Sequence, residues 1–161
     1  MKKRKSNKIA LCCGSGGHYE ELSIIDRGLL PQFTNRFWVV NKSFREETRT
    51  DAKEYYVIDY GDMSVARMIA KIIILLAQNL YIFIKERPNV LISTGPLTGI
   101  GIAVLVHLTG GKVVFIECSA QVKNPSLSGK IFYRISNQFF VQWSSLLGYY
   151  PNALFKGQLL R

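Results

Sequence analysis

The chain has 161 residues, with 21 Lys and Arg against 11 Asp and Glu, so its formal net charge is +10. This length predicts one domain with a substantial core, and a hydrophobic content of 48% excludes an intrinsically disordered chain. The positive excess favours an anionic partner, such as nucleic acid, an acidic lipid surface or a phosphorylated substrate. Five of the cations lie within the first eight residues. We therefore expect residues 1–8 to form a basic tail and residues 9–161 to form a single domain.

The cysteine content indicates a reducing compartment. The three cysteines are Cys12, Cys13 and Cys118, an odd number without a C-x-x-C pair. This pattern argues against a disulfide framework and against a zinc site, and it favours a cytosolic setting. The apolar run that follows the basic tail, residues 9–13, is too short for a secretory signal. A basic tail on a cytosolic domain remains able to contact anionic lipid.

Short apolar runs alternate with helical stretches along the chain. In chain order we predict a strand at 8–13, a helix at 19–29, strands at 37–41 and 55–60, a helix at 63–87, a strand at 89–93, a helix at 97–108, a strand at 112–117, a helix at 126–136 and a strand at 139–143. This alternation predicts an α/β fold, a Rossmann-like parallel sheet with helices on both faces. In such sheets, ligands bind at the carboxyl ends of the strands.

The long predicted helix has an uneven distribution of polar residues. When each residue advances by about 100°, four polar residues fall in one stripe roughly 40° wide; they are Arg67, Lys71, Gln78 and Lys85. Asn79 lies outside this stripe, and the rest of the circumference is apolar. Two charges within the span argue against a transmembrane helix. Two interpretations stay open: a helix packed deep in the fold, or a helix that lies on a bilayer or against a partner.

A glycine-rich segment joins the first predicted strand to the first predicted helix. It contains Gly14, Ser15, Gly16, Gly17 and His18. Glycines permit positive φ angles and close approach of a ligand to the backbone, and the N–H groups at the start of a helix favour a phosphate. His18 would stand at the mouth of this loop, where a neutral imidazole can act as a general base. The alternative is a structural turn with a locally bonded histidine.

Other nucleotide-binding signatures are absent from the sequence. A dinucleotide fingerprint would need a third glycine where Tyr19 stands, and an acidic residue at the end of the second strand, which is Asn41. No P-loop string occurs. Asp59 and Asp62 are too far apart for an Asp-x-Asp string. We therefore predict no NAD cofactor and no metal.

A second loop of small residues follows the predicted strand 89–93. Its candidate substrate-binding residues are Thr94, Gly95, Pro96 and Thr98. A proline suits the first turn of a helix, and small residues leave room for a ligand, although a plain connection would look similar. Glu117 ends the next strand at the same edge, where it would either accept from sugar hydroxyls or cap a turn. The aromatic residues form no stacking stripe, so we predict no nucleic-acid partner.

Four strings carry a resemblance to a known family. They are G-S-G-G-H at 14–18, P-N-V-L-I-S-T-G-P at 88–96, F-I-E-C-S-A-Q-V-K-N-P-S-L-S-G-K-I-F-Y at 115–133 and F-F-V-Q-W at 139–143. Together they resemble the asparagine-linked-glycosylation protein fourteen family, with its bacterial PssD-type counterparts in capsule and exopolysaccharide synthesis. The first string is shared with MurG-like glycosyltransferases. Cys118 and Gln121 stand where the family usually has Ser and Arg.

The resemblance implies the N-terminal half of a two-domain GT-B glycosyltransferase. Family members hold a lipid-linked acceptor at the membrane, while a separate subunit supplies most of the UDP-sugar site. The implied acceptor is linked to a polyprenyl diphosphate, and no metal cofactor is implied. Residues 151–157 resemble the final strand and the turn toward a second domain. Eukaryotic members carry an N-terminal membrane span, whereas only the basic tail precedes the first strand here.

These observations lead to one prediction of function and two alternatives. We predict a membrane-associated, acceptor-binding subunit of a heteromeric inverting glycosyltransferase on the cytoplasmic face of the membrane, bound peripherally or monotopically. It would transfer a sugar from a UDP-sugar to a lipid-linked saccharide in capsule, exopolysaccharide or lipid-linked oligosaccharide synthesis, with His18 as the base. The first alternative is a non-catalytic membrane anchor and activator of a partner transferase. The second is a stand-alone Rossmann-type small-molecule binding protein.

Overall fold

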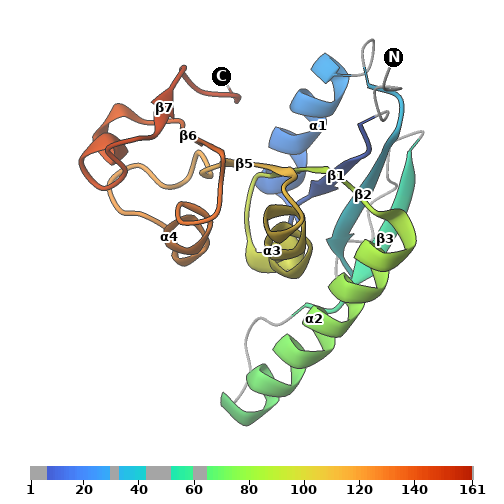
Figure 1. The fold of residues 1–161 in the computed structure, drawn as a ribbon. Helices are drawn as coiled ribbons and strands as arrows, with labels where there is room; N and C mark the ends of the chain where they lie inside the picture. Colours follow the sequence, from blue (N-terminus) through green and yellow to red (C-terminus); the bar gives the residue numbers. More distant parts are fainter. Residues whose placement is uncertain (1–6, 30–32, 43–51, 60–64, 161) are drawn as a thin grey trace.

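The computed structural model describes residues 7–29, 33–42, 52–59 and 65–160 (Figure 1). The strands are β1 (Ile9–Cys12), β2 (Arg36–Asn41), β3 (Lys53–Val57), β4 (Val90–Ser93), β5 (Lys112–Ile116), β6 (Gln138–Val141) and β7 (Leu154–Phe155). The helices are α1 (Gly17–Leu29), α2 (Val65–Glu86), α3 (Ile100–Leu108) and α4 (Leu127–Phe132), with 3₁₀ turns η1 (Leu97–Gly99) and η2 (Ser144–Gly148). The strands form one parallel sheet in the order β3-β2-β1-β4-β5-β6-β7.

The strand order places a switch point at the middle of the sheet. The chain first runs outward from β1 to β3, and α2 then returns it to β4 on the other side of β1. The carboxyl ends of neighbouring strands lie side by side, because Cys12 pairs with Ser93 and Ser93 pairs with Phe115, one residue before the end of β5. The loops that follow β1, β4 and β5 therefore meet at one edge, which is where ligands bind in open parallel sheets.

Alternate side chains of the central strands build two separate cores, because successive residues of a strand point to opposite faces. On one face α1 contributes Tyr19 and Leu22 to a cluster with Leu11 and Trp38. The other face carries α2, α3 and α4 and a larger cluster that includes Phe115 (Figure 1). Helices thus cover both faces, and the predicted α/β Rossmann-like fold is confirmed.

Element boundaries differ from the predictions mainly toward the C-terminus. The helix predicted at 126–136 is the short α4, and the strand predicted at 139–143 ends at Val141 before η2 begins at Ser144. The helix predicted at 97–108 starts as the 3₁₀ turn η1. The strand predicted at 55–60 begins at Lys53 and ends at Val57. Residues 1–6 of the basic tail, residue 60, and residues 63 and 64 of the predicted long helix lie outside the described residues.

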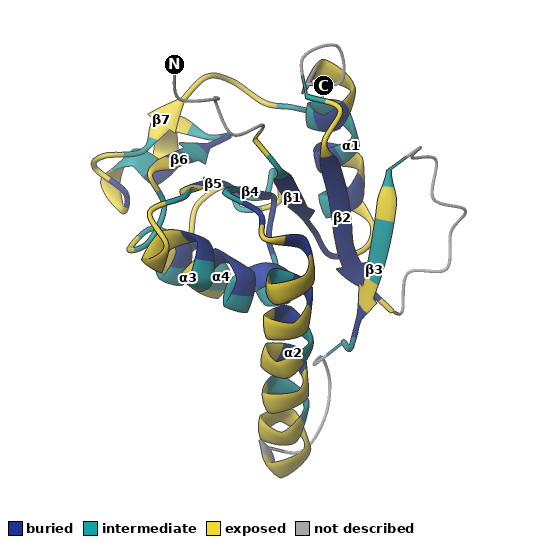
Figure 2. Cartoon of the chain, turned by 45° about the vertical axis from the view of Figure 1, so that its right-hand side comes forward, coloured by how far each residue is buried: buried dark blue, intermediate teal, exposed yellow. Residues whose placement is uncertain are grey.

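The long helix α2 is not packed deep in the fold. Its buried positions are Leu75, Asn79, Ile82 and Glu86, one narrow face that rests on α3 and the sheet. The opposite side is apolar and exposed; it includes Ile69, Ile73, Leu76, Leu80 and Ile84. Figure 2 shows this helix extending beyond the body of the protein with most of its surface exposed. By length and composition α2 is also apolar enough to cross a membrane.

Polar residues of α2 hold it to the body. Asn79 donates to the carbonyls of Leu75 and Thr98 and accepts from the Ile102 N–H at 3.2 Å, so the residue outside the predicted polar stripe is the one that is buried. Gln78 accepts from the Ile58 N–H at 2.9 Å. Gln78 and Asn79 thus fix α2 to the body, and the exposed apolar side is left without an intramolecular partner among the described residues.

Glu86 fastens the end of α2 to β3 and to the residue before β1. Its carboxylate pairs with Lys53 at 2.6 Å and Lys8 at 2.5 Å, and it accepts a hydrogen bond from the Tyr55 hydroxyl. Burial by itself would raise the pKa of Glu86, but the hydrogen bonds from Lys53, Lys8 and Tyr55 lower it to about 2. A lowered pKa stabilises the fold above the unfolded-state value of about 4.3 and loses this effect as the pH falls toward 2.

We therefore expect Glu86→Gln to reduce the free energy of unfolding by about 2 kcal/mol at pH 7. The variant should also lose less stability than the parent protein between pH 5 and pH 2, because its amide does not titrate. Urea unfolding at a series of pH values measures both effects. Glu20→Gln is the control, since Glu20 is an exposed acid in the first turn of α1. Parallel losses with pH in the parent and in Glu86→Gln would contradict this assignment.

Candidate functional site

The two predicted loops are joined at the switch point. The N–H of Gly14 donates to the carbonyl of Gly95 at 3.2 Å. A Cβ at Gly14 would lie 2.6 Å from the Pro96 ring, so the close contact of the loops requires a glycine there. Gly16 and Gly95 have φ angles of 63° and 90°, which side chains rarely adopt. The sequence-based expectation that these loops share one edge is confirmed.

His18 is held by the second loop through a reciprocal pair of hydrogen bonds. Its Nδ1 lies 2.8 Å from the carbonyl oxygen of Thr94, and the Thr94 hydroxyl donates to the carbonyl of His18 at 2.8 Å. A carbonyl only accepts, so Nδ1 carries the proton and Nε2 of the neutral ring keeps its lone pair. The ring also lies against Gly95, where a Cβ would come within 3.3 Å of Cε1. The imidazole therefore has one tautomer and one orientation.

A carboxylate that the sequence analysis did not single out lies beside His18. Glu21 is fully buried on α1, and its Oε1 accepts from the Ser119 N–H and the Gln142 side chain, each at 2.9 Å. Its Oε2 is buried without a hydrogen-bond partner in the described part of the chain. A ring nitrogen of His18, a carboxylate oxygen of Glu21 and the Sγ of Cys118 lie within 4.8 Å of one another.

Sequence reasoning had one signal for part of this cluster. His18 and Glu21 are three positions apart at the start of a helix, a spacing that puts both side chains on one face. Cys118 and Gln142 carry no local signal, because they reach the cluster from the loops after β5 and β6. Burial raises the pKa of the Cys118 thiol, so the thiol stays protonated at neutral pH and is not an activated nucleophile.

Glu117 faces the interior of the protein. It is 1% exposed, and its carboxylate accepts from the Ser126 hydroxyl at 2.7 Å and the Tyr150 hydroxyl at 3.2 Å. Ser126 in turn caps α4 by accepting from the Gly129 N–H at 2.8 Å. In this structure Glu117 anchors the chain between β5 and α4, which is the turn-capping alternative of the sequence analysis. A substrate contact by Glu117 stays a prediction.

The remaining predicted site residues divide into exposed and buried groups. Ser15, Gly16 and Gly17 are exposed at the tip of the first loop, where α1 begins and the first N–H groups of a helix have no acceptor within the helix. Thr98 is buried, and its hydroxyl donates to Asn41 at 2.9 Å within the core. His107 is exposed in the last turn of α3 and does not belong to this site.

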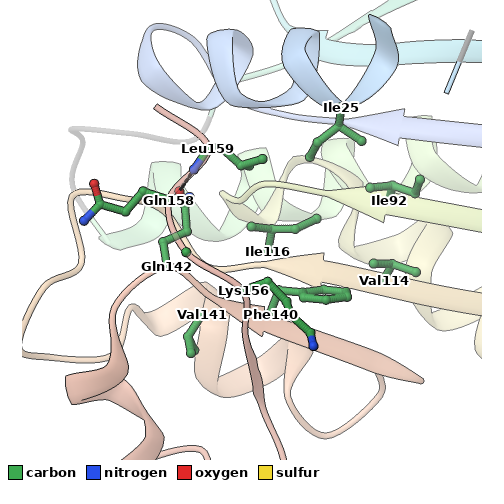
Figure 3. Close-up of a pocket in the computed structure, with 11 residues that line it drawn as sticks. Ile25, Ile92, Val114, Ile116, Phe140, Val141, Gln142, Lys156, Gln158 and Leu159 are labelled. Atoms are coloured by element: carbon green, nitrogen blue, oxygen red, sulfur yellow. Dashed lines mark hydrogen bonds between the residues drawn. The ribbon is translucent and has the colours of Figure 1, made fainter. Parts of the chain in front are cut away.

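An apolar pocket of about 300 Å³ opens on the sheet face that carries α1 (Figure 3). Its lining comes from β4, β5, β6, α1 and the C-terminal segment; it includes Ile25, Ile92, Val114, Ile116, Phe140 and Leu159. Gln142 connects this pocket with the cluster around His18, because its side chain accepts from the Leu159 N–H at 2.8 Å and donates to Glu21. The pocket is thus an uncovered part of the sheet face next to the candidate site.

Comparison of the sequence with models of known protein families gives a match to one family. The model for "Oligosaccharide biosynthesis protein Alg14 like" matches residues 9–159. The chain belongs to this Alg14-like family. The resemblance drawn from the glycine loops and from residues 115–133 is therefore confirmed, and the match extends over nearly the whole predicted domain.

Relatives and solved structures agree with this assignment. The UDP-N-acetylglucosamine transferase subunit ALG14 of Candida albicans is 29% identical over 171 residues, which are 95% of this chain and 78% of that protein. The human subunit of the same name is 24% identical over 185 residues, which are 98% of this chain and 85% of that protein. Both relatives thus match almost the whole of this Alg14-like chain.

Among solved structures, MurG of Acinetobacter baumannii matches with a TM-score of 0.69 at 12% identity, over 94% of this chain and 44% of that one. The UDP-GlcNAc 2-epimerase of Neisseria meningitidis gives 0.67 at 12% identity, over 94% of this chain and 46% of that one. The Alg14-like chain spans less than half the length of either structure. At this identity the likeness shows the fold, which is that of MurG-like GT-B N-terminal domains.

Proposed function

We propose that this Alg14-like protein is the acceptor-binding subunit of a heteromeric glycosyltransferase. It would take part in the transfer of N-acetylglucosamine from UDP-N-acetylglucosamine to a lipid-linked saccharide. The observation that carries the proposal is the pair of joined loops at the switch point, which fixes His18 with a free Nε2 beside exposed backbone N–H groups. The names of the relatives supply the donor sugar and the term subunit.

In the proposed reaction His18 acts as the general base. Its Nε2 takes the proton of the acceptor hydroxyl while that oxygen attacks the anomeric carbon of the donor sugar, and the bond from that carbon to the diphosphate breaks with UDP as leaving group. The exposed N–H groups at Gly16 and Gly17 would bind the diphosphate of the lipid-linked acceptor or the incoming donor. Thr94 would position the ring rather than bind substrate, since its hydroxyl and carbonyl both bond to His18.

The second subunit would supply most of the nucleotide-sugar site. The described residues offer one cluster of loops at the sheet edge, on a fold that matches 44% and 46% of two solved structures. The apolar pocket beside the site is the surface that we assign to this partner, because its lining is apolar and Val114 and Phe140 of the sheet face are only half-buried. An apolar segment of the second subunit would fill it.

The partner requirement can be tested with the purified protein. We expect the chain alone to show negligible transfer of radiolabelled N-acetylglucosamine to a polyprenyl-diphosphate-linked saccharide. The complex captured with the tagged chain from detergent-solubilised membranes of its own cells should be active. Ile25→Glu, at the pocket rim, should lose the captured subunit, whereas Leu127→Glu on the exposed face of α4 should keep it. Robust turnover by the single chain would overturn the proposal of a two-subunit enzyme.

Membrane attachment is part of the same proposal. The outward side of α2 carries exposed apolar residues from Met68 to Ile84, a span of about 25 Å at about 1.5 Å per residue. The exposed side of Ile73 and its neighbours suits a helix that lies in the membrane interface with its buried face against the body. Residues 1–6 of the basic tail, which lie outside the described residues, would add attraction to anionic lipid, and the free cysteines fit the cytoplasmic face.

The non-catalytic alternative predicts a different result for one variant. If the protein only anchors and activates its partner, His18→Ala would leave the rate of the complex unchanged. If the protein is a stand-alone binding protein, no second subunit would be captured, and the chain would be a monodisperse monomer without detergent. The geometry around His18 favours the catalytic proposal, because an anchor would not need a ring nitrogen with its lone pair held open at the sheet edge. Participation in capsule or exopolysaccharide synthesis rests only on the resemblance to bacterial PssD-type proteins, and it stays a prediction.

A further inference from the structure

The cluster of His18, Glu21 and Cys118 has the composition of a transition-metal site. It brings one nitrogen, one carboxylate oxygen and one sulfur within 4.8 Å of one another. Nitrogen and sulfur ligands favour ions such as Zn²⁺ over Mg²⁺ or Ca²⁺, which take oxygen ligands. In a tetrahedral zinc site with ligand bonds of about 2.0–2.3 Å, ligand atoms lie about 3.5 Å apart. Inward movements of about 1 Å would therefore complete the geometry.

Hydrogen bonds to other residues already orient two of the three proposed ligands, His18 and Glu21. The Nδ1–H group of His18 donates a hydrogen bond to the Thr94 carbonyl at 2.8 Å, which leaves Nε2 as the coordinating atom. Oε1 of Glu21 is held by the Ser119 N–H and by the Gln142 side chain, each at 2.9 Å. These contacts orient the ring and the carboxylate independently of any ion.

The second carboxylate oxygen of Glu21, Oε2, favours a bound cation. Glu21 is 0% exposed, and Oε2 has no hydrogen-bond partner in the described part of the chain. Leaving a buried carboxylate oxygen unpaired costs free energy. A cation held between this oxygen, the ring of His18 and the Cys118 sulfur would remove that cost.

We propose that His18, Glu21 and Cys118 bind one divalent transition-metal ion of the Zn²⁺ class, with a fourth position open to water. Coordination converts the Cys118 thiol to a thiolate, and its proton passes to solvent. The ion takes the lone pair of His18 Nε2, so it competes with the base. This last consequence, inhibition of transfer by the ion, rests on the proposed function, whereas metal binding itself does not.

The experiment uses the full chain without a histidine tag, cleared of metal with a chelator. Co²⁺ is titrated first, because a thiolate ligand produces a charge-transfer band in the near ultraviolet. Zn²⁺ affinity then follows from competition with a coloured chelator. We expect one equivalent of metal, the charge-transfer band, and weakening of at least tenfold in Cys118→Ala and in Glu21→Gln. His107→Ala, which changes the other histidine of the chain, should bind as the parent protein does.

Two results would overturn the site. One is the absence of the Co²⁺ band in a folded parent protein, and the other is equal metal affinity in the parent and in Cys118→Ala. Circular dichroism checks that each variant is folded; if Glu21→Gln does not fold, Cys118→Ala decides by itself, since its half-buried side chain is not in the main cores. Because the readout is binding, an inactive complex with a good metal site would count against the proposed function and not against the site.

Discussion

Replacing His18 by alanine should lower kcat of the two-subunit complex by about 10²–10⁴-fold, the usual contribution of a general base. The variant should still fold and still capture its partner. The ring makes one hydrogen bond, to the loop after β4 at the sheet edge, and its removal leaves both cores in place. The measurement is single-turnover transfer with saturating donor and acceptor. His107→Ala is the matched control, because that residue is exposed on α3.

Gly16→Val tests the same loop without touching the base. Gly16 has a φ of 63°, and a Cβ there would meet no atom within 4 Å, so a valine would act through backbone strain and through its bulk at the ligand side. We expect a loss of rate larger than that of His18→Ala. An unchanged rate in His18→Ala, with capture intact, would assign His18 a structural role and favour the anchor alternative.

Replacing Ile73 and Leu76 of α2 by serine should abolish the salt-resistant binding of the chain to anionic vesicles. Both side chains are exposed, at 62% and 43%, and they belong to the apolar side that faces away from the body. Burying such a side chain in an apolar phase contributes about 1.5–3 kcal/mol. Loss of two therefore weakens binding by about 3 kcal/mol, which is about a hundredfold.

The assay is vesicle co-sedimentation across a salt series. Deletion of residues 2–5 should reduce binding at low salt only, because attraction between charges is screened beyond about 8 Å at physiological salt. Leu127→Ser combined with Leu154→Ser is the control, since it removes two exposed apolar side chains that lie outside α2. If the parent protein remains in the supernatant at every salt concentration, α2 does not bind lipid, and its apolar side covers a protein partner instead.

The sequence by itself determined the sheet and the position of the two loops. Alternation of apolar runs with helical periods is a local property, and a parallel sheet brings the ends of its strands to one edge whatever their order. For that reason Gly14 and Gly95 were placed together correctly. The strings at 115–133 and 139–143 also sufficed to identify the family, because they are specific to it, whereas the glycine loop is shared with MurG-like glycosyltransferases.

Only the tertiary structure decided which side chains face the site and which side of α2 faces out. Glu21 and Ser119 are 98 positions apart in the chain, and their contact depends on strand order and loop paths that no local pattern specifies. Glu117 stands at the predicted edge, yet its carboxylate turns inward because Ser126 and Tyr150 offer donors there. The helical spacing of the polar residues of α2 predicts a narrow polar stripe, but this spacing does not determine which side of the helix packs against the body. The buried Asn79, with its bonds to Thr98 and Ile102, sets the orientation of the helix and leaves its apolar side exposed.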